Sequence, residues 1–141
     1  MQAHILLAGV TTIALFGACA GTRGAEGLLG KEWVLQSYGV IGSEKTVAPS
    51  TQITLGFSSD NTIHGSAGCN RYFSAYEAGK NNTLSIQNIG ATKMWCGRPV
   101  MDQEKRYFEA LENTSTFTIE GHRLQLFSDN GQRVLTFIKK E

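Results

Sequence analysis

The chain lacks a sustained excess of either charge. Its 141 residues include 13 lysines and arginines and 12 aspartates and glutamates, which leaves a formal net charge of +1. No run of basic residues is longer than two, as at Lys139 and Lys140. Proteins that bind nucleic acid usually concentrate positive charge on one surface. Nucleic acid is therefore not an expected partner of this chain.

Residues suited to catalysis or metal binding are also few. The sequence holds three cysteines and three histidines, and they do not show the spacing of a zinc site. The glycine-rich residues 65–68 are not followed by the Gly-Lys-Ser/Thr of a phosphate loop. Three carboxylates of a predicted helix, Glu104, Glu109 and Glu112, are expected to face solvent rather than to form a catalytic pair. No metal, cofactor or catalytic residue is therefore expected.

A long hydrophobic run is missing as well. The apolar residues 5–16 are too few for a typical membrane-spanning helix. They lead into two small residues and Cys19, an order that is similar to a bacterial lipobox, in which small residues admit a signal peptidase and the cysteine is then acylated. Phe16 departs from that pattern, and no lysine or arginine occurs among the first 22 residues.

The N-terminal region predicts that the protein is located in the cell envelope. We expect residues 1–19 to be a signal peptide, Cys19 to carry a lipid and residues 20–27 to form a tether. A plainly cleaved signal and a retained anchor are the two alternatives. Ala20, rather than an aspartate, follows the cysteine, which favours the outer membrane with the domain facing the periplasm. The domain itself is predicted to cover residues 28–141.

From residue 33 onward the sequence alternates short apolar segments with turns. Apolar residues recur with a period of two, as at Ile53, Leu55 and Phe57. The predicted strands are residues 33–38, 52–57, 62–66, 71–77, 84–86, 91–95, 117–119, 124–126 and 135–137. Residues 129–131, Asp-Asn-Gly, are typical of the turn of a final β-hairpin.

One segment differs, because residues 99–112 have a helical period. Pro99 suits the first turn of a helix, and Met101, Phe108 and Leu111 fall on one face. An amphipathic helix buries its apolar face against another layer, which here is the sheet. The sequence thus predicts an α+β domain: a curved antiparallel sheet or small open β-barrel of about eight short strands, with one α-helix packed against it.

Two cysteines remain for the domain once Cys19 is assigned to the signal. An exported protein enters an oxidising compartment, which favours a disulfide between Cys69 and Cys96. Closing a loop of this length stabilises a small domain by about 3 to 4 kcal/mol in the chain-entropy model. The alternative interpretation is a catalytic thiol at Cys69, with His64 or His122 as its base.

Several motifs, taken in order, match one known family. They are Trp33-Val34-Leu35, Gly65-Ser66-Ala67-Gly68-Cys69-Asn70-Arg71-Tyr72, Thr92-Lys93-Met94-Trp95-Cys96, Met101 with Glu104, and Leu124-Gln125-Leu126. On these motifs the chain resembles the META domain family, which includes the HslJ-like bacterial heat shock lipoproteins. The resemblance spans nearly all of residues 28–141. It implies a small α+β domain, often lipid-anchored and associated with stress tolerance, antibiotic resistance or virulence, and it implies no established reaction.

The predicted function follows from the signal, the cysteine pair and this resemblance. We expect a monomeric, non-enzymatic, lipid-anchored envelope protein that supports stress or antibiotic tolerance and binds an envelope protein or a small apolar ligand. One alternative is a pilotin-like or chaperone-like module for a secretion or outer-membrane component, with a peptide groove beside Trp95 or Phe108. The other alternative is a thiol enzyme that uses Cys69.

Four residues near the cysteine pair, Gly68, Asn70, Arg71 and Trp95, form a candidate binding or structural motif. For Asn70 the structural interpretation is a hydrogen bond from its side chain to the backbone of its own turn. The sequence leaves both roles of the motif open.

Overall fold

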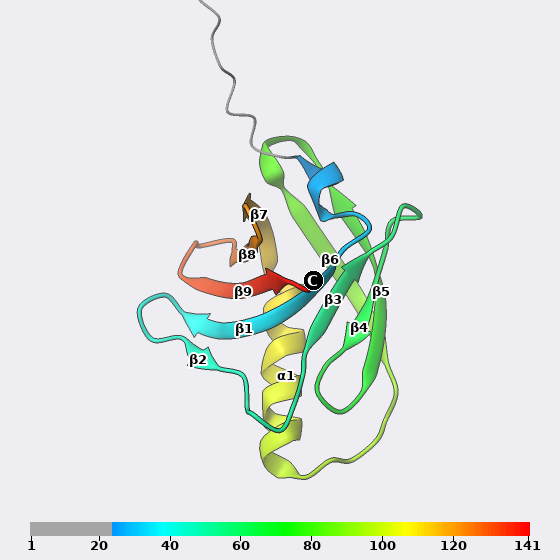
Figure 1. Cartoon of the computed structure of the whole chain (residues 1–141), viewed down its shortest axis with the longest axis vertical. Helices are drawn as coiled ribbons and strands as arrows, with labels where there is room; N and C mark the ends of the chain where they lie inside the picture. Colours follow the sequence, from blue (N-terminus) through cyan, green and yellow to red (C-terminus); the bar gives the residue numbers. More distant parts are fainter. Residues whose placement is uncertain (1–23) are drawn as a thin grey trace, which may run out of the picture.

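The structure, a computed structural model, describes residues 24–141 and shows a curled sheet with one α-helix against it (Figure 1). The predicted signal peptide, Cys19 and residues 20–23 of the predicted tether lie outside the described residues. A short 3-10 turn, η1 (Ala25–Leu28), precedes the sheet. Within the described part of the chain, no helix has the length and the apolar character needed to span a membrane.

Within residues 24–141, nine strands form the sheet. They are β1 (Glu32–Val40), β2 (Lys45–Thr46), β3 (Thr54–Phe57), β4 (Thr62–Ser66), β5 (Arg71–Ala78), β6 (Leu84–Ala91), β7 (Thr114–Glu120), β8 (Arg123–Ser128) and β9 (Arg133–Lys139). The strands pair antiparallel in the order β6-β5-β4-β3-β1-β9-β8-β7, with β2 beside β1. The two ends of this order come together at one antiparallel bridge, between Thr83 and Thr116. The predicted fold, a curved antiparallel sheet with one helix, is confirmed.

The predicted strands need two corrections. Residues 91–95 do not form a separate strand, because β6 continues to Ala91 and residues 92–97 have no regular structure. The backbone of Met94 is bonded by the side chain of Asn70 instead of by a neighbouring strand. The short strand β2, which pairs with β1, was not predicted, since its two residues are too few to show a pattern.

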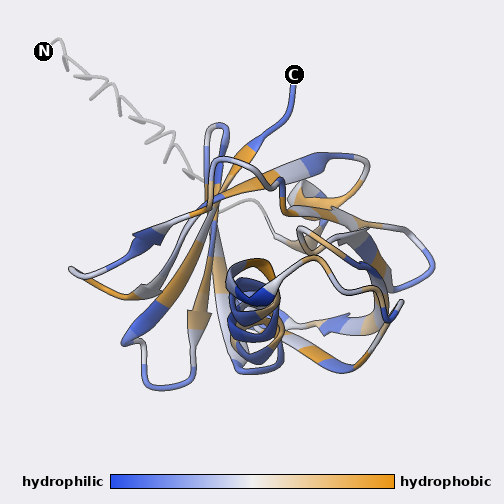
Figure 2. Cartoon of the chain, turned by 90° about the horizontal axis from the view of Figure 1, so that it is seen from below, coloured by the Kyte–Doolittle hydropathy of each residue, from blue (hydrophilic) through white to orange (hydrophobic). Residues whose placement is uncertain are grey.

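Helix α1 (Arg98–Glu112) begins one residue earlier than predicted, with Pro99 in its first turn. Figure 2, viewed nearly along the helix, shows sheet strands on either side of α1 and above it. The predicted face is confirmed for Leu111, which is buried, and for Phe108, which packs against the core while partly exposed, whereas Met101 is also partly exposed. The buried residues of the helix are Gln103, Glu104, Tyr107 and Leu111. Two polar side chains therefore take positions that an apolar pattern assigns to hydrophobic residues.

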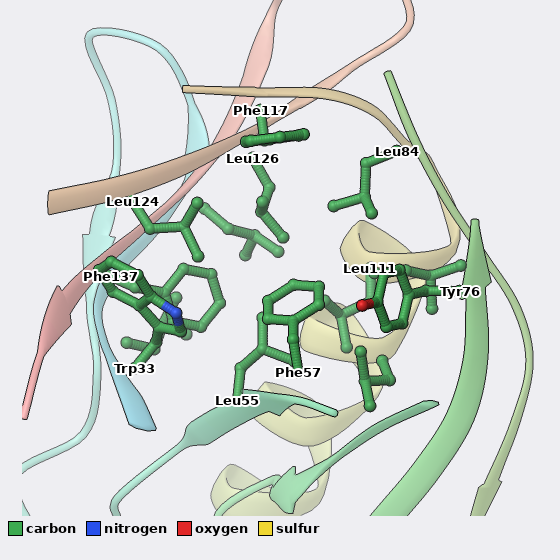
Figure 3. Close-up of a cluster of buried hydrophobic side chains, with 14 of the residues drawn as sticks. Trp33, Leu55, Phe57, Tyr76, Leu84, Leu111, Phe117, Leu124, Leu126 and Phe137 are labelled. Carbon is green, nitrogen blue, oxygen red and sulfur yellow. The ribbon is translucent and has the colours of Figure 1, made fainter. Parts of the chain in front are cut away.

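The core lies between the concave face of the sheet and α1. Figure 3 shows large side chains from separate strands meeting in this space, among them those of Trp33, Phe57, Phe117 and Phe137. Trp33 and Phe137 are 0% exposed and Phe117 is 1% exposed. Burying a side chain of this size stabilises a fold by about 1.5 to 3 kcal/mol. The apolar core therefore holds the sheet in its curled form around the helix.

Candidate functional site

The glycine-rich turn between β4 and β5 is fixed by its own backbone and by a disulfide. The N–H of Ala67 donates to the carbonyl of Asn70 at 2.8 Å. Gly68 has a φ of +101°, which residues with a side chain rarely adopt. Cys69 forms the predicted disulfide with Cys96, with 5.8 Å between their Cα atoms. The bond ties this turn to the segment that leads into α1, and we call residues 67–70 and 92–97 together the corner.

Asn70 joins the two parts of the corner with its side chain. Its Nδ2 donates to Glu104 Oε1 at 2.6 Å and to the carbonyl of Met94 at 3.3 Å. Its Oδ1 accepts from the N–H of Met94 at 2.7 Å and from the hydroxyl of Thr92 at 2.9 Å. Asn70 is only 2% exposed, so its amide is satisfied within the protein. It bonds the backbone of a distant segment, whereas the structural interpretation expected a bond within its own turn.

Glu104 anchors the corner to α1. Its carboxylate accepts hydrogen bonds from the backbone N–H of Asn70 at 2.8 Å and from the Asn70 side chain at 2.6 Å. The prediction that Glu104 faces solvent is wrong, because the residue is 4% exposed, whereas Glu109 and Glu112 are exposed as predicted. No salt bridge among the described residues includes Glu104. Hydrogen bonds from Asn70 therefore compensate for the hydration that the buried carboxylate loses.

Gln103 makes a similar connection to the loop before β3. Its Oε1 accepts from the N–H of Ala48 at 2.9 Å, and its Nε2 donates to the hydroxyl of Thr51 at 2.8 Å. Gln103 was not predicted as a site residue, because the polar side chains of an amphipathic helix are expected to face solvent. The spacing along the helix could have indicated that Gln103 and Glu104 are buried, since both lie one helical turn before the buried Tyr107 and so share its face.

Two buried tyrosines lie behind the corner. The hydroxyl of Tyr72 donates to the carbonyl of Thr54 at 2.7 Å and lies 2.6 Å from the hydroxyl of Tyr107. Since Tyr72 has a single hydroxyl proton, Tyr107 is the donor of the second bond. Burial raises the pKa of both phenols well above the ordinary value of 10.0. Tyr72 reaches Thr54 across Gly65, where a Cβ atom would collide with the Thr54 carbonyl oxygen.

The corner exposes two large apolar side chains. Met94 is 54% exposed and Trp95 is 73% exposed, although Asn70 and the disulfide hold the backbone beneath them. The side chain of Arg71 is exposed next to this segment, and its backbone N–H donates to the hydroxyl of Thr92 at 3.2 Å. An ordered backbone that presents an aromatic side chain loses little conformational entropy when it binds. The corner is therefore suited to contact with a partner.

The catalytic alternative needs a thiol that is not free in this structure, because Cys69 is in the disulfide. His64 is exposed on β4, with its Nδ1 3.4 Å from Ser58 Oγ, and His122 lies in the turn between β7 and β8. Within residues 24–141, no group of three or more His, Cys, Asp or Glu side chains is placed to hold a metal ion. The corner supplies fixed hydrogen bonds and an exposed surface rather than a recognisable set of reacting groups.

A cleft of about 630 Å³ lies on another flank of α1. It is bounded by α1, by the hairpin of β1 and β2, and by strands β8 and β9. Its lining includes apolar side chains such as Tyr38 and Leu135 and the charged side chains Lys45, Arg106, Glu109 and Arg133. The predicted peptide groove beside Trp95 or Phe108 does not coincide with this cleft, since neither residue lines it.

Solved structures that resemble the chain include the following three. The NMR structure of a protein from Burkholderia xenovorans is 26% identical, has a TM-score of 0.70, and aligns over 99% of each chain. The crystal structure of a DUF4847 family protein from Bacteroides vulgatus is 16% identical, with a TM-score of 0.60, over 82% of this chain and 98% of the other. A further protein solved by NMR is 24% identical, with a TM-score of 0.61, over 80% of this chain and 92% of the other. The last two likenesses show the fold alone.

The family comparison covers almost the whole described chain. Residues 26–141 match the model of the META domain. No match is found among curated proteins. The matched residues contain all of the sheet, α1 and the corner, and the motifs of the sequence resemblance lie within them. The chain therefore belongs to the META domain family.

Proposed function

We propose that this chain is a non-enzymatic, lipid-anchored envelope protein that binds a partner through the corner and supports stress or antibiotic tolerance. The lipid anchor and the location in the envelope are supported by Cys19 and the apolar and small residues before it. The observation that carries the binding role is the exposure of Met94 and Trp95 on a backbone held by Asn70 and the disulfide. The link with stress tolerance is the association that the family resemblance implies.

Trp95 has the properties of an anchor residue for a protein partner. Tryptophan buries a large apolar area and is enriched among interface residues whose truncation costs most affinity. Lys93 and Arg98 are exposed on either side of it, and Arg71 is exposed nearby. We therefore infer a partner that offers an apolar pocket with acidic groups around it. In Figure 1, η1 lies at the far end of the domain from the start of α1, so an anchored chain would present the corner away from its tether.

Cross-linking in cells tests the binding role. With a photoreactive residue at Lys93, we expect a discrete cross-linked species that Trp95→Ala abolishes, together with the stress tolerance of the cells. Ile41→Ala is the matched control, since Ile41 is 50% exposed in the turn between β1 and β2, away from the corner. The control should keep both the cross-link and the tolerance. A cross-link that survives Trp95→Ala would contradict a role for the corner.

The anchor and the absence of a reaction have separate tests. The mass of the protein isolated from membranes should show acyl groups on Cys19, and Cys19→Ser should release the protein from the membrane. Incubation of the wild-type protein with envelope extracts should produce no turnover. An activity that disappears in Cys69→Ser or Asn70→Ala would overturn the non-enzymatic part of the proposal.

A pilotin-like or chaperone-like module is the second candidate, and the cleft between α1 and the sheet favours it. Grooves of this kind accept apolar peptide segments in other proteins. Ala110 is partly exposed in the cleft, so Ala110→Trp would fill it. Co-purification of a secretion or outer-membrane component that Ala110→Trp prevents, and that Trp95→Ala does not, would support this candidate over the first.

A further inference from the structure

The cleft beside α1 gathers positive charge that the chain as a whole does not have. Three cationic side chains, Lys45, Arg106 and Arg133, line it, together with the carboxylate of Glu109. The lining thus has a formal excess of two positive charges, whereas the entire sequence has a net charge of +1. Folding therefore brings together around one cleft three cations that lie far apart along the sequence.

The three cations come from separate elements and stay exposed. Lys45 belongs to β2, Arg106 to α1 and Arg133 to β9. None of them takes part in a salt bridge among residues 24–141, and the only acid of the lining, Glu109, is 4.0 Å from Lys105. Like charges around one cleft repel each other and attract an anion. An anionic group in the cleft would therefore relieve this repulsion.

The walls beneath the charges are mainly apolar, and Ser43, Asn113 and Ser128 add polar groups to the lining. Tyr38 and Ala110 are partly exposed within the cleft, and Leu126 and Leu135, each 1% exposed, lie at its base. The volume of about 630 Å³ is within the usual range of about 300 to 1,000 Å³ for sites that bind small organic molecules. An apolar body with one anionic group matches both the walls and the charged rim.

We propose that this cleft binds a small amphipathic anion, a carboxylate or sulfonate on a compact apolar body. The anionic group lies between Arg106 and Arg133, whose planar guanidinium groups suit paired oxygen atoms, and the body lies against Tyr38 and Ala110. The inference rests on the proposed binding function. It adds a second binding surface, the cleft, and names the class of ligand that this surface binds. The corner and the cleft are tested with different variants, so the failure of one leaves the other standing.

Two dyes with the same aromatic body test the need for negative charge. 1-Anilinonaphthalene-8-sulfonate carries a sulfonate that N-phenyl-1-naphthylamine lacks. With the full chain we expect saturable binding of the sulfonate dye, at least about tenfold tighter than that of the neutral dye, because hydrogen bonds to charged groups are lost with the sulfonate. The double variant Arg106→Gln with Arg133→Gln should weaken binding of the sulfonate dye about tenfold and leave the neutral dye unchanged.

A second double variant separates a site from general charge attraction. Arg98→Gln with Arg123→Gln removes the same net charge at exposed positions outside the cleft, and it should leave both affinities unchanged. Octanoate should displace the sulfonate dye, whereas octanamide should not. Equal affinity for the two dyes, or an equal loss in the two double variants, would overturn the proposal. Displacement by an acidic peptide but not by octanoate would also overturn it, in favour of a protein segment.

Discussion

Helix α1 separates two regions that use polar side chains in opposite ways. On the corner flank, Asn70 and Glu104 are buried and bonded to each other, and Asn70 also bonds both backbone groups of Met94. On the cleft flank, Arg106 and Arg133 are exposed, and neither is in a salt bridge among the described residues. The polar groups of the corner are occupied in holding the fold, whereas those of the cleft are available to a ligand.

The energetic reason for the difference is burial. A buried carboxylate without a partner costs several kcal/mol, so the groups around Glu104 depend on one another. An exposed charge keeps its hydration and contributes little to stability. Substitutions of the buried Asn70 or Glu104 should therefore reduce the free energy of unfolding, whereas substitutions of the exposed Arg106 and Arg133 should change binding alone.

Asn70→Ala tests this contrast with the largest expected effect. The substitution removes the side-chain bonds to Glu104, Met94 and Thr92 and leaves a buried charge with fewer partners. We expect the free energy of unfolding, measured by urea denaturation, to fall by about 3 to 5 kcal/mol. The double variant Arg106→Gln with Arg133→Gln is the comparison and should change it by less than about 0.5 kcal/mol. Similar values for the two would show that the flanks do not differ.

Removal of the disulfide should have the next largest effect. The variant Cys69→Ala with Cys96→Ala should lose about 3 kcal/mol of stability, since the bridge no longer limits the unfolded chain. Amide hydrogen exchange should quicken in residues 92–97 and remain slow in β8 and β9, which border the cleft. Uniformly faster exchange across both regions would argue against a local role for the disulfide in the corner.

The two buried tyrosines behind the corner should make stability depend on alkaline pH, and this effect on the free energy of unfolding is expected to be smaller than those above. The pKa values of Tyr72 and Tyr107 are raised by burial, so above about pH 10 the unfolded chain releases these protons before the folded chain does. Their contribution to stability should be complete below pH 10 and should decline above it, by up to about 1.4 kcal/mol per pH unit for each tyrosine. Denaturant titrations between pH 8 and pH 11 measure this slope.

Two variants assign the slope to the buried pair. Tyr107→Phe should make the alkaline decline shallower, because one of the two buried phenols is gone. Tyr38→Phe removes a partly exposed hydroxyl on the cleft flank and is the matched control. A decline that is the same in Tyr107→Phe and in the wild type would refute the assignment.

The predictable features of the molecule were those encoded over a few neighbouring residues. The alternation at Ile53, Leu55 and Phe57 indicates a strand, and Asp-Asn-Gly at residues 129–131 indicates the final hairpin; both are present. The Cys69 to Cys96 pairing followed from the count of cysteines and the expected compartment. The buried face of α1 was partly mispredicted because hydropathy does not reveal that Glu104 has a buried partner.

By itself, the sequence determined the antiparallel sheet, the single helix, the cysteine pair and the family, because periodicity, turn residues and ordered motifs are local properties of the chain. Only the tertiary structure decided that Asn70 meets Glu104 and Met94, and that Lys45, Arg106 and Arg133 line one cleft. These groups lie far apart along the chain. Their meeting depends on the register of the strands and on how far the sheet curls around α1, which only the packing of the whole core sets.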